Sequence, residues 1–175
     1  TGTSRSSRSS SGGGKAEDSI KVRIIDFGSA CKVGKTVHTC VQSRHYRSPE
    51  VVLKLPYDGK IDVWSLGCVL YELYTGKTLF SATSSVEHIY QIREVFGDIP
   101  TSMLTKARQS TMFHAETGKP TDAAAAVRAA RCAKSPLASL FASSPSAGSD
   151  EEAFAEVLES MLAVDPDLVL FHFIS

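Results

Sequence analysis

The sequence predicts a mainly α-helical domain, and three segments carry that prediction. Residues 60–75 are apolar on nearly every helical face, which is typical of a helix buried at the centre of a domain, and Gly76 follows where such a helix ends. Residues 84–96 begin with a Ser-x-x-Glu capping box and continue with an amphipathic pattern. Residues 149–162 also begin with a Ser-x-x-Glu capping box and continue with an amphipathic pattern.

Length, charge and cysteine usage narrow the class of protein. The chain has 175 residues, enough for one modest core, and its 19 basic residues balance 19 acidic ones. Zero net charge gives no reason to expect nucleic acid or a membrane surface as a partner. No apolar run is long enough to span a bilayer, and no signal peptide opens the chain. Four irregularly spaced cysteines without a Cys-x-x-Cys pair indicate a reduced intracellular protein, cytoplasmic, nuclear or both.

The chain divides into four stretches of different composition. Residues 1–19 are rich in Ser, Gly and Arg and cannot bury enough apolar surface to offset their ordering entropy, so we expect them to be disordered. Residues 20–101 hold the strongest structural patterns. Residues 102–150 form a divergent Ala- and Ser-rich insert of low complexity, in which only Ala123–Lys134 predicts a helix. Residues 151–175 hold the terminal helix and a truncated apolar tail.

The segment before the first helix reads as a strand followed by a long loop. Residues 20–25 alternate weakly between polar and apolar and predict a buried strand. Residues 26–48 mix Gly, Ser, Thr and Cys without a helical period, which predicts a loop. Pro49 favours the first position of a short helix that continues to Leu55.

A run that ends in Gly34-Lys35-Thr36 is similar to part of a phosphate-binding P-loop, but its spacing is wrong. A P-loop has four residues between its glycines, whereas five separate Gly28 from Gly34. The motif also needs a helix that starts at Gly-Lys-Thr, and the run that follows is β-branched and loop-like. We therefore reject a P-loop nucleotide site.

Four motifs occur in the order in which the C-terminal lobe of a protein kinase carries them. The first ends the predicted strand, the second follows the loop, the third lies in the predicted central helix and the fourth closes the last helix. The motifs are Asp26-Phe27-Gly28, Ser48-Pro49-Glu50, Asp62-Val63-Trp64-Ser65-Leu66-Gly67 and Met161-Leu162-Ala163-Val164-Asp165-Pro166. The chain resembles a partial protein-kinase C-terminal lobe with a long activation loop and without an N-terminal lobe.

Further runs narrow the resemblance, which is dense over residues 20–100 and weaker after them. Ser43-Arg44-His45-Tyr46-Arg47 is similar to the CMGC group of kinases. A narrower resemblance is to the family of dual-specificity tyrosine-regulated kinases (DYRK). It depends on Ile25–Cys31, Val41–Arg44 and Leu55–Asp58.

The resemblance implies that the full-length parent uses ATP and Mg²⁺ and acts on a protein substrate. Asp26 corresponds to a magnesium ligand, and hard cations do take carboxylate oxygens. Phe27 is expected to pack inward and orient Asp26. Gly28 is expected to let the backbone turn beside the cofactor, where a side chain would clash.

The resemblance also implies roles on the substrate side. Glu50 is expected to pair with an arginine near the end of the lobe, and Asp62 to accept hydrogen bonds from the catalytic-loop backbone. Arg47 is expected to lie beside the pocket next to the phosphate acceptor, and Trp64 to belong to the core. The other positions that it implies are Arg44 and Tyr46 in the activation segment and Ser48, Pro49 and Gly67 as structural residues.

Several kinase parts have no counterpart before Asp26. The sequence contains no Gly-rich loop, no Val-Ala-Ile-Lys lysine and no His-Arg-Asp loop, so the resemblance assigns no catalytic residue to this chain. Preorganised positioning supplies about 7–11 kcal/mol of barrier lowering in enzymes. We therefore expect the chain alone to be inactive and do not expect it to bind ATP by itself.

The activation loop departs from the family at one further position. Cys40 stands where the family has its regulatory tyrosine, and a thiol cannot accept that phosphate. Thr36 or Thr39 is the alternative acceptor. Cys40 is either an inert loop residue or a reactive thiol beside Arg44, and the inert reading is favoured because activation of a thiol needs a specific electropositive site.

Three functions fit this sequence. The first is part of an ATP-dependent serine/threonine kinase, or a dual-specificity kinase. The second is a catalytically dead, kinase-like module that binds proteins near Arg44 and Arg47 and along the helix at 85–96. The third is a truncated product without a function of its own. The sequence favours the first and leaves the oligomeric state and the substrate open.

Overall fold

The protein is described here by a computed structural model. It describes residues 21–32, 34, 41–107, 121 and 149–169. The chain forms two compact units, Thr1–Ala30 and Cys31–Ser175, and each is described by itself. None of the described residues lies in a β-strand, and nearly all regular structure is helical. The prediction of a mainly α protein is confirmed.

The first unit holds the segment in which a strand was expected. Residues 21–25 form no strand, and Val22, Ile24 and Ile25 are 84%, 81% and 78% exposed. The prediction of a buried strand at 20–25 is therefore wrong for these residues. A strand needs a partner for its backbone N–H and C=O groups, and the described residues provide none. A short 3-10 helix, η1 (Phe27–Ser29), follows this segment.

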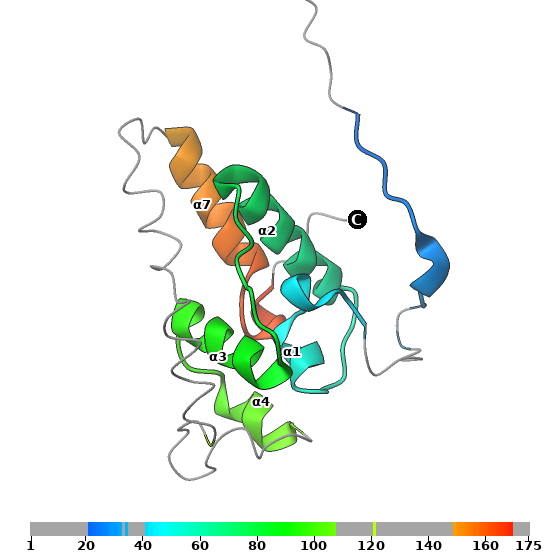
Figure 1. Ribbon diagram of the computed structural model, residues 1–175, viewed down its shortest axis with the longest axis vertical. Helices are drawn as coiled ribbons and strands as arrows, with labels where there is room; N and C mark the ends of the chain where they lie inside the picture. Colours follow the sequence, from blue (N-terminus) through cyan, green and yellow to red (C-terminus); the bar gives the residue numbers. More distant parts are fainter. Residues whose placement is uncertain (1–20, 33, 35–40, 108–120, 122–148, 170–175) are drawn as a thin grey trace, which may run out of the picture. The chain divides into compact units, whose positions relative to one another are not determined.

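The second unit is a cluster of helices (Figure 1). Helix α7 packs alongside α2, and α1 packs against α3, although α7 is far from α2 in sequence. No helix in the described ranges is both long and apolar enough to cross a membrane. The elements are η2 (Arg44–Tyr46), α1 (Pro49–Val52), α2 (Lys60–Thr75), α3 (Ser85–Phe96), α4 (Thr101–Lys106), α7 (Ser149–Met161) and η4 (Pro166–Leu168).

Helices α2 and α3 have the predicted bounds, and their caps explain why. Helix α2 ends at Gly76, whose backbone is left-handed with φ 69°. At the start of α3 the Ser84 hydroxyl accepts a hydrogen bond from the backbone N–H of Glu87 at 3.1 Å. The Glu87 carboxylate binds the backbone N–H and the hydroxyl of Thr83, at 3.0 and 2.7 Å. The predicted capping box is thus formed on its Ser84 side, while Glu87 caps the preceding residue.

Helix α7 follows its predicted pattern in part. Leu158 and Leu162 are fully buried, as expected for an inner face. Val157 was expected beside them but is 46% exposed, so this part of the predicted inner face is wrong. The helix predicted at Ala123–Lys134 lies outside the described residues.

The core of the second unit lies between α2, α3 and the segment that joins them. Trp64 is 1% exposed and stacks on Phe80, with ring centroids 6.1 Å apart. The edge of Phe96 meets the Trp64 indole at 5.6 Å. The prediction that Trp64 is a core residue is confirmed. The largest of the other fully buried side chains are Tyr71, Tyr90, Leu53, Ile89, Ile92, Leu158 and Leu162.

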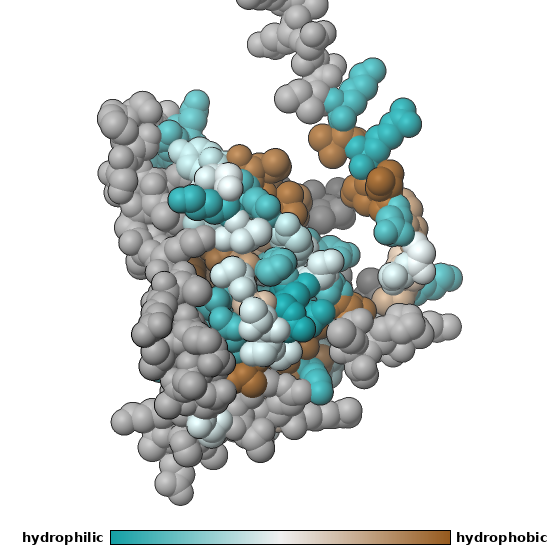
Figure 2. Space-filling view, viewed as in Figure 1, coloured by the Kyte–Doolittle hydropathy of each residue, from teal (hydrophilic) through white to brown (hydrophobic). Residues whose placement is uncertain are grey.

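Helix α2 is not buried on every face, although its composition predicted that it would be. Leu66, Val69 and Leu73 are 49%, 38% and 76% exposed. They lie on one helical face, which we call the α2 stripe. Figure 2 shows hydrophobic surface along the upper part of α2, on the side away from α7. The sequence pattern of a central helix is present, but the described neighbours cover only its other faces.

Candidate functional site

Asp26, the expected magnesium ligand, precedes η1 in the first unit. Its backbone is left-handed, with φ 66° and ψ 60°, a conformation that Asp adopts more readily than most residues with a Cβ. Phe27 is 68% exposed, so the expected inward packing of this ring is absent. The reason is that η1 has no buried residue against which the ring could pack.

Asp26 fits one ligand of a magnesium ion, and the described residues do not form a complete metal site. Among the described residues, no group of three or more His, Cys, Asp or Glu side chains could hold a metal ion. Magnesium commonly takes one or two carboxylates and completes its shell with phosphate and water oxygens. The single Asp26 carboxylate is compatible with that arrangement when a nucleotide supplies the other ligands.

Gln42 connects the loop before α1 to the start of α2. Its amide Nε2 donates to the Ile61 carbonyl oxygen and to Ser65 Oγ, both at 2.7 Å. Its Oε1 accepts from the Ser48 backbone N–H at 3.0 Å and from the Ser48 hydroxyl at 3.2 Å. Gln42 itself has a left-handed backbone, with φ 63°. One part-buried amide thereby fixes three backbone segments relative to one another.

Arg47 closes the same loop from the other side. Its Nε donates to the Val41 carbonyl oxygen at 3.1 Å, and its Nη2 donates to the Gln42 carbonyl oxygen at 2.8 Å. The planar guanidinium fork suits two acceptors held side by side. Residues 41–47 therefore form a compact loop, in which the carbonyl oxygens of Val41 and Gln42 accept hydrogen bonds from Arg47.

Tyr46 attaches this loop to the middle of α2. Its hydroxyl donates to Glu72 Oε2 at 2.7 Å, and this hydrogen bond to a carboxylate is the main reason that the pKa of Tyr46 is raised. The Ser65 hydroxyl donates to the Tyr46 carbonyl oxygen at 2.8 Å. His45 Nδ1 lies 3.0 Å from the Phe80 carbonyl oxygen. The loop thus contacts α2 and the segment after it at several points.

Ser48, Pro49 and Glu50 are all buried where the loop enters α1. Glu50 is 4% exposed, and burial raises the pKa of its carboxyl, an effect opposed by hydrogen bonds from its own N–H and from Ser48. No Lys, Arg or His of the described chain forms an ion pair with Glu50. The arginine partner that the resemblance implied is not among the described residues.

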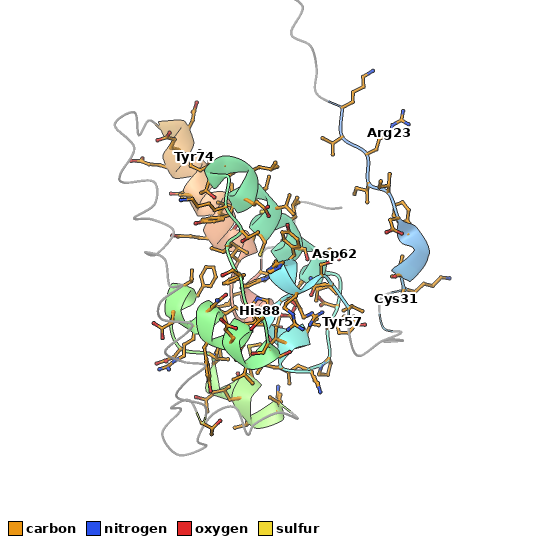
Figure 3. The ribbon with its side chains drawn as sticks, in the orientation of Figure 1. Arg23, Cys31, Tyr57, Asp62, Tyr74 and His88 are labelled. Carbon is orange, nitrogen blue, oxygen red and sulfur yellow. The ribbon has the colours of Figure 1, made fainter. Side chains whose placement is uncertain are left out.

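The motif in α2 places its three expected residues in different surroundings. Asp62 is exposed in the first turn of α2 (Figure 3), and no described residue donates the hydrogen bonds expected for its carboxylate. Trp64 lies in the core. Gly67 faces α7, where an added Cβ would lie 2.9 Å from two side-chain carbons of Leu162 and 3.3 Å from Cβ of Met161. Gly67 is therefore structural, as expected, because it permits the close approach of α2 and α7.

His88 is a buried polar residue near the loop that the sequence did not single out. Figure 3 labels it among the helices, and its side chain is 1% exposed. Burial lowers the pKa of its imidazole to about 3, and the charges of Arg47, Arg44 and His45 lower it further. His88 is therefore a neutral residue packed against Phe80, whose ring centroid is 5.1 Å away.

The structure brings some of the predicted residues together and leaves others apart. Tyr46, Arg47 and Ser48 share the network with Gln42. Asp26, Phe27 and Gly28 belong to the other unit. Thr36, Thr39 and Cys40 lie outside the described residues, so their roles stay predictions.

Gln42, Ser65 and Glu72 were missed by reasoning from the sequence. Gln42 belongs to the run Val41–Arg44 that narrowed the family resemblance, but nothing in the run indicated hydrogen bonds for it, since an amide in a loop is normally solvated. Ser65 and Glu72 did carry one. They are polar residues seven positions apart in an otherwise apolar helix, and that spacing puts them on one face, where a polar partner is to be expected.

Comparisons with known proteins identify the family. A family model described as the protein kinase domain matches residues 15–168. The chain is 46% identical over 100 residues to the DYRK-family kinase pom1 of Schizosaccharomyces pombe. It is 48% identical over 99 residues to dual specificity tyrosine-phosphorylation-regulated kinase 2 of Drosophila melanogaster, and 50% identical over 93 residues to kinase 4 of the same name in Homo sapiens.

The matches span unequal shares of the proteins compared. They cover 57%, 57% and 53% of this chain but 9%, 14% and 18% of these relatives. A solved crystal structure of a kinase domain has a TM-score of 0.70 and 30% identity to the chain, covering 85% of this chain and 43% of the other. The chain therefore belongs to the protein kinase domain family and is related within it to the DYRK kinases of the CMGC group.

Proposed function

We propose that this chain is part of an ATP-dependent protein kinase, supplies one magnesium ligand and the substrate-side loop, and is inactive by itself. The observation that carries the proposal is the loop at 41–48, which Gln42 joins to α2 and Arg47 closes from within. A fixed loop suits phosphoryl transfer, because that reaction depends mostly on positioning and charge neutralisation.

Asp26 is the proposed link to the nucleotide. Magnesium, when bound, neutralises charge that develops on the phosphate oxygens. The role of this chain is to present the Asp26 carboxylate on a left-handed residue followed by the short turn of η1. A Cβ added at Gly28 would lie 3.6 Å from Asp26 Oδ1, an ordinary contact, so the clash expected for a side chain at this position is not seen among the described residues.

The acceptors that we propose are serine and threonine hydroxyls of proteins, and dual specificity is the alternative. The names of the Drosophila and human relatives describe them as dual-specificity kinases. Assays with peptides that differ only in Ser, Thr or Tyr at the acceptor position separate the two. Transfer to Ser and Thr alone supports the first, and transfer to all three supports the alternative.

We also propose a preference for proline directly after the acceptor. We infer from the family resemblance that Arg47 lies beside the pocket for that residue. The guanidinium already donates to the carbonyl oxygens of Val41 and Gln42, so a substrate N–H near them would have to compete with it for these acceptors. A buried N–H without a partner costs about 1–3 kcal/mol. Proline has no N–H to leave unpaired.

A chimeric kinase tests the proposed function. Residues 21–107 of this chain replace the matching segment of the Drosophila relative, and transfer of labelled phosphate to a protein substrate is measured. The proposal predicts an active chimera in which Asp26→Asn lowers kcat roughly 100-fold or more, because a charged group that acts in the transition state is lost. Asp98→Asn is the matched control, since Asp98 is an 84% exposed carboxylate paired with Arg93.

A protein-binding module without catalysis is the second candidate. The observation that favours it is Cys40, in the position where the family carries its regulatory tyrosine. An inactive chimera, with no difference between Asp26 and Asp26→Asn, contradicts the kinase proposal and supports this alternative. Kinase activity is then measured in a chimera with Cys40→Tyr. Restored activity indicates that only the regulatory phosphate site was missing, and continued inactivity indicates that the catalytic site itself does not work.

A further inference from the structure

Gln42 has a backbone conformation that its residue type does not favour. Its φ of 63° lies in the left-handed region, where the Cβ of an ordinary residue comes too close to the following carbonyl oxygen. Glycine adopts this region freely, and Asn and Asp adopt it more readily than other residues with a Cβ. Gln has neither advantage, so contacts with the surrounding structure must stabilise residue 42 in this conformation.

The side chain of Gln42 makes such contacts. Its Nε2 donates to the Ile61 carbonyl oxygen and to Ser65 Oγ, both at 2.7 Å. Its Oε1 accepts hydrogen bonds from the backbone N–H and the hydroxyl of Ser48, at 3.0 and 3.2 Å. Ile61 and Ser65 belong to α2, and Ser48 is fully buried at the start of α1. The amide therefore ties residue 42 to two helices.

The backbone of residue 42 sets the direction of two carbonyl groups. The peptide groups before and after Cα of Gln42 are planar, so φ and ψ of this one residue fix the angle between the Val41 and Gln42 carbonyl groups. Arg47 donates to both oxygens, from Nε at 3.1 Å and from Nη2 at 2.8 Å. A planar guanidinium that donates twice requires two acceptors side by side. The left-handed conformation of residue 42 meets this requirement.

We propose that the Gln42 side chain positions Arg47 for substrate selection. By holding residue 42 in the left-handed conformation, it keeps the Val41 and Gln42 carbonyl oxygens aligned for the guanidinium. Gln42 is thus a positioning residue, because it acts through Arg47. Its effect on substrate choice rests on the proposed preference for proline. Its effect on Arg47 does not, and that effect is measured without catalysis.

Two substitutions separate the side chain of residue 42 from its backbone conformation. Gln42→Asn and Gln42→Gly introduce residues that adopt the left-handed region at least as readily as Gln. Neither can replace the contacts with α2, since the Asn side chain is one methylene shorter and Gly has no side chain. If the backbone preference alone aligned the carbonyl groups, both variants would keep the arrangement. The proposal predicts that both lose it.

Hydrogen exchange of the Arg47 Nε–H tests the effect on Arg47 directly. The exchange rate with water is measured by heteronuclear NMR in the intact chain and in both variants. We expect exchange to be roughly tenfold faster or more in each variant, because a hydrogen bond from a charged donor no longer protects the Nε–H. An unchanged rate in either variant would overturn the proposal.

Gly76→Ala is the matched control for stability. This substitution strains the left-handed backbone at the end of α2 without removing a contact of the loop, and a Cβ there would have no atom within 4 Å. It should leave the exchange rate of the Arg47 Nε–H unchanged. The same acceleration in Gly76→Ala would mean that the Gln42 variants act through overall stability, and would overturn the proposal.

Substrate selection is measured in the chimeric kinase, as the ratio of kcat/KM for peptides with Pro or Ala after the acceptor serine. Gln42→Asn should lower this ratio toward one. Ser65→Ala, which removes one acceptor of the Gln42 amide, should lower it less. Gly76→Ala should leave it unchanged, because both peptides meet the same folded enzyme and the folded fraction cancels in the ratio.

The outcomes distinguish this inference from the proposed function. A chimera that prefers proline and keeps the preference in Gln42→Asn overturns the role of Gln42 and leaves the proposed function intact. A chimera without the preference contradicts the proline proposal and the role of Gln42 in selection. The exchange rate of the Arg47 Nε–H then still decides whether Gln42 orients the guanidinium.

Discussion

Glu50 is a buried carboxyl whose neighbours in the described chain include no ion-pair partner. Because burial raises the pKa of Glu50, the folded state binds a proton more tightly than the unfolded state does. The stability that the protonated Glu50 contributes is therefore lost as pH rises from the pKa of Glu50 in the unfolded state to its higher pKa in the folded state. At neutral pH the charge is a cost to the fold.

Glu50→Gln tests this account. The variant should be more stable than the unchanged chain by about 1 kcal/mol at pH 7, and the difference should shrink as pH falls below the usual pKa of Glu. Urea unfolding followed by the fluorescence of Trp64, the single tryptophan, measures it. Glu94→Gln on the exposed side of α3 is the matched control. A destabilised Glu50→Gln would indicate a cationic partner for Glu50.

His88 predicts the opposite dependence on pH. Its pKa falls from 6.5 to about 3 on folding, so the unfolded state takes up a proton first as the solution becomes acidic. Stability should decline as pH falls from about 6.5 toward 3, with a slope approaching about 1.4 kcal/mol per pH unit from this residue. His88→Gln should lack that part of the slope in urea titrations. Equal slopes in both proteins would show that His88 is protonated in the folded state.

For single residues, burial was easier to predict than the hydrogen-bond partners of polar side chains. The positions of Trp64 and of Ser48-Pro49-Glu50 followed from apolar neighbours and from the family motif. The hydrogen bonds of Gln42 could not be predicted, because they join residues 19 and 23 positions apart. The partners of a polar side chain in a loop depend on tertiary structure, which a local pattern does not contain.

Among the elements, helices α2 and α7 approach each other closely at Gly67, and a substitution there tests this contact. Gly67→Ala gains about 1 kcal/mol of helix propensity, but its Cβ would lie 2.9 Å from Cγ of Leu162, which cannot swing away like the end of a flexible chain. Overpacking of this kind costs about 1–3 kcal/mol. We expect net destabilisation of about 1 kcal/mol in urea unfolding.

Gly76→Ala provides the comparison for that prediction. Gly76 has φ 69°, and a Cβ added there would have no atom within 4 Å, so the cost of the substitution comes from the backbone alone, about 1 kcal/mol. Adding Leu162→Ala should relieve Gly67→Ala by removing the side chain that it meets, and should not relieve Gly76→Ala. A stabilised Gly67→Ala would mean that α7 moves away at little cost.

The elements also show where reasoning from sequence succeeds. Helices α2 and α3 were predicted with their observed bounds, because Ser84, Gly76 and Gly97 are local signals that act within one turn. The strand at 20–25 was predicted from alternation, yet a strand requires a partner that is non-local. The exposure of the α2 stripe was missed for the same reason, since composition does not tell which faces have neighbours.

For the molecule as a whole, we propose that the loop closed by Arg47 and joined to α2 by Gln42 lies on the substrate side of a kinase. The family is shown by the match to residues 15–168. The proposed preference for proline rests on the hydrogen bonds that Arg47 donates to the carbonyl oxygens of Val41 and Gln42.

The most direct test compares kcat/KM of the chimeric kinase for two peptides that differ only in Pro or Ala after the acceptor serine. We expect a ratio of roughly 5 to 160 in favour of proline, because an unpaired N–H costs about 1–3 kcal/mol. Arg47→Ala should lower that ratio toward one, and Arg93→Ala, at an arginine paired with exposed Asp98, should leave it unchanged. A ratio near one in the unsubstituted chimera, or a ratio that Arg47→Ala does not alter, would contradict the account.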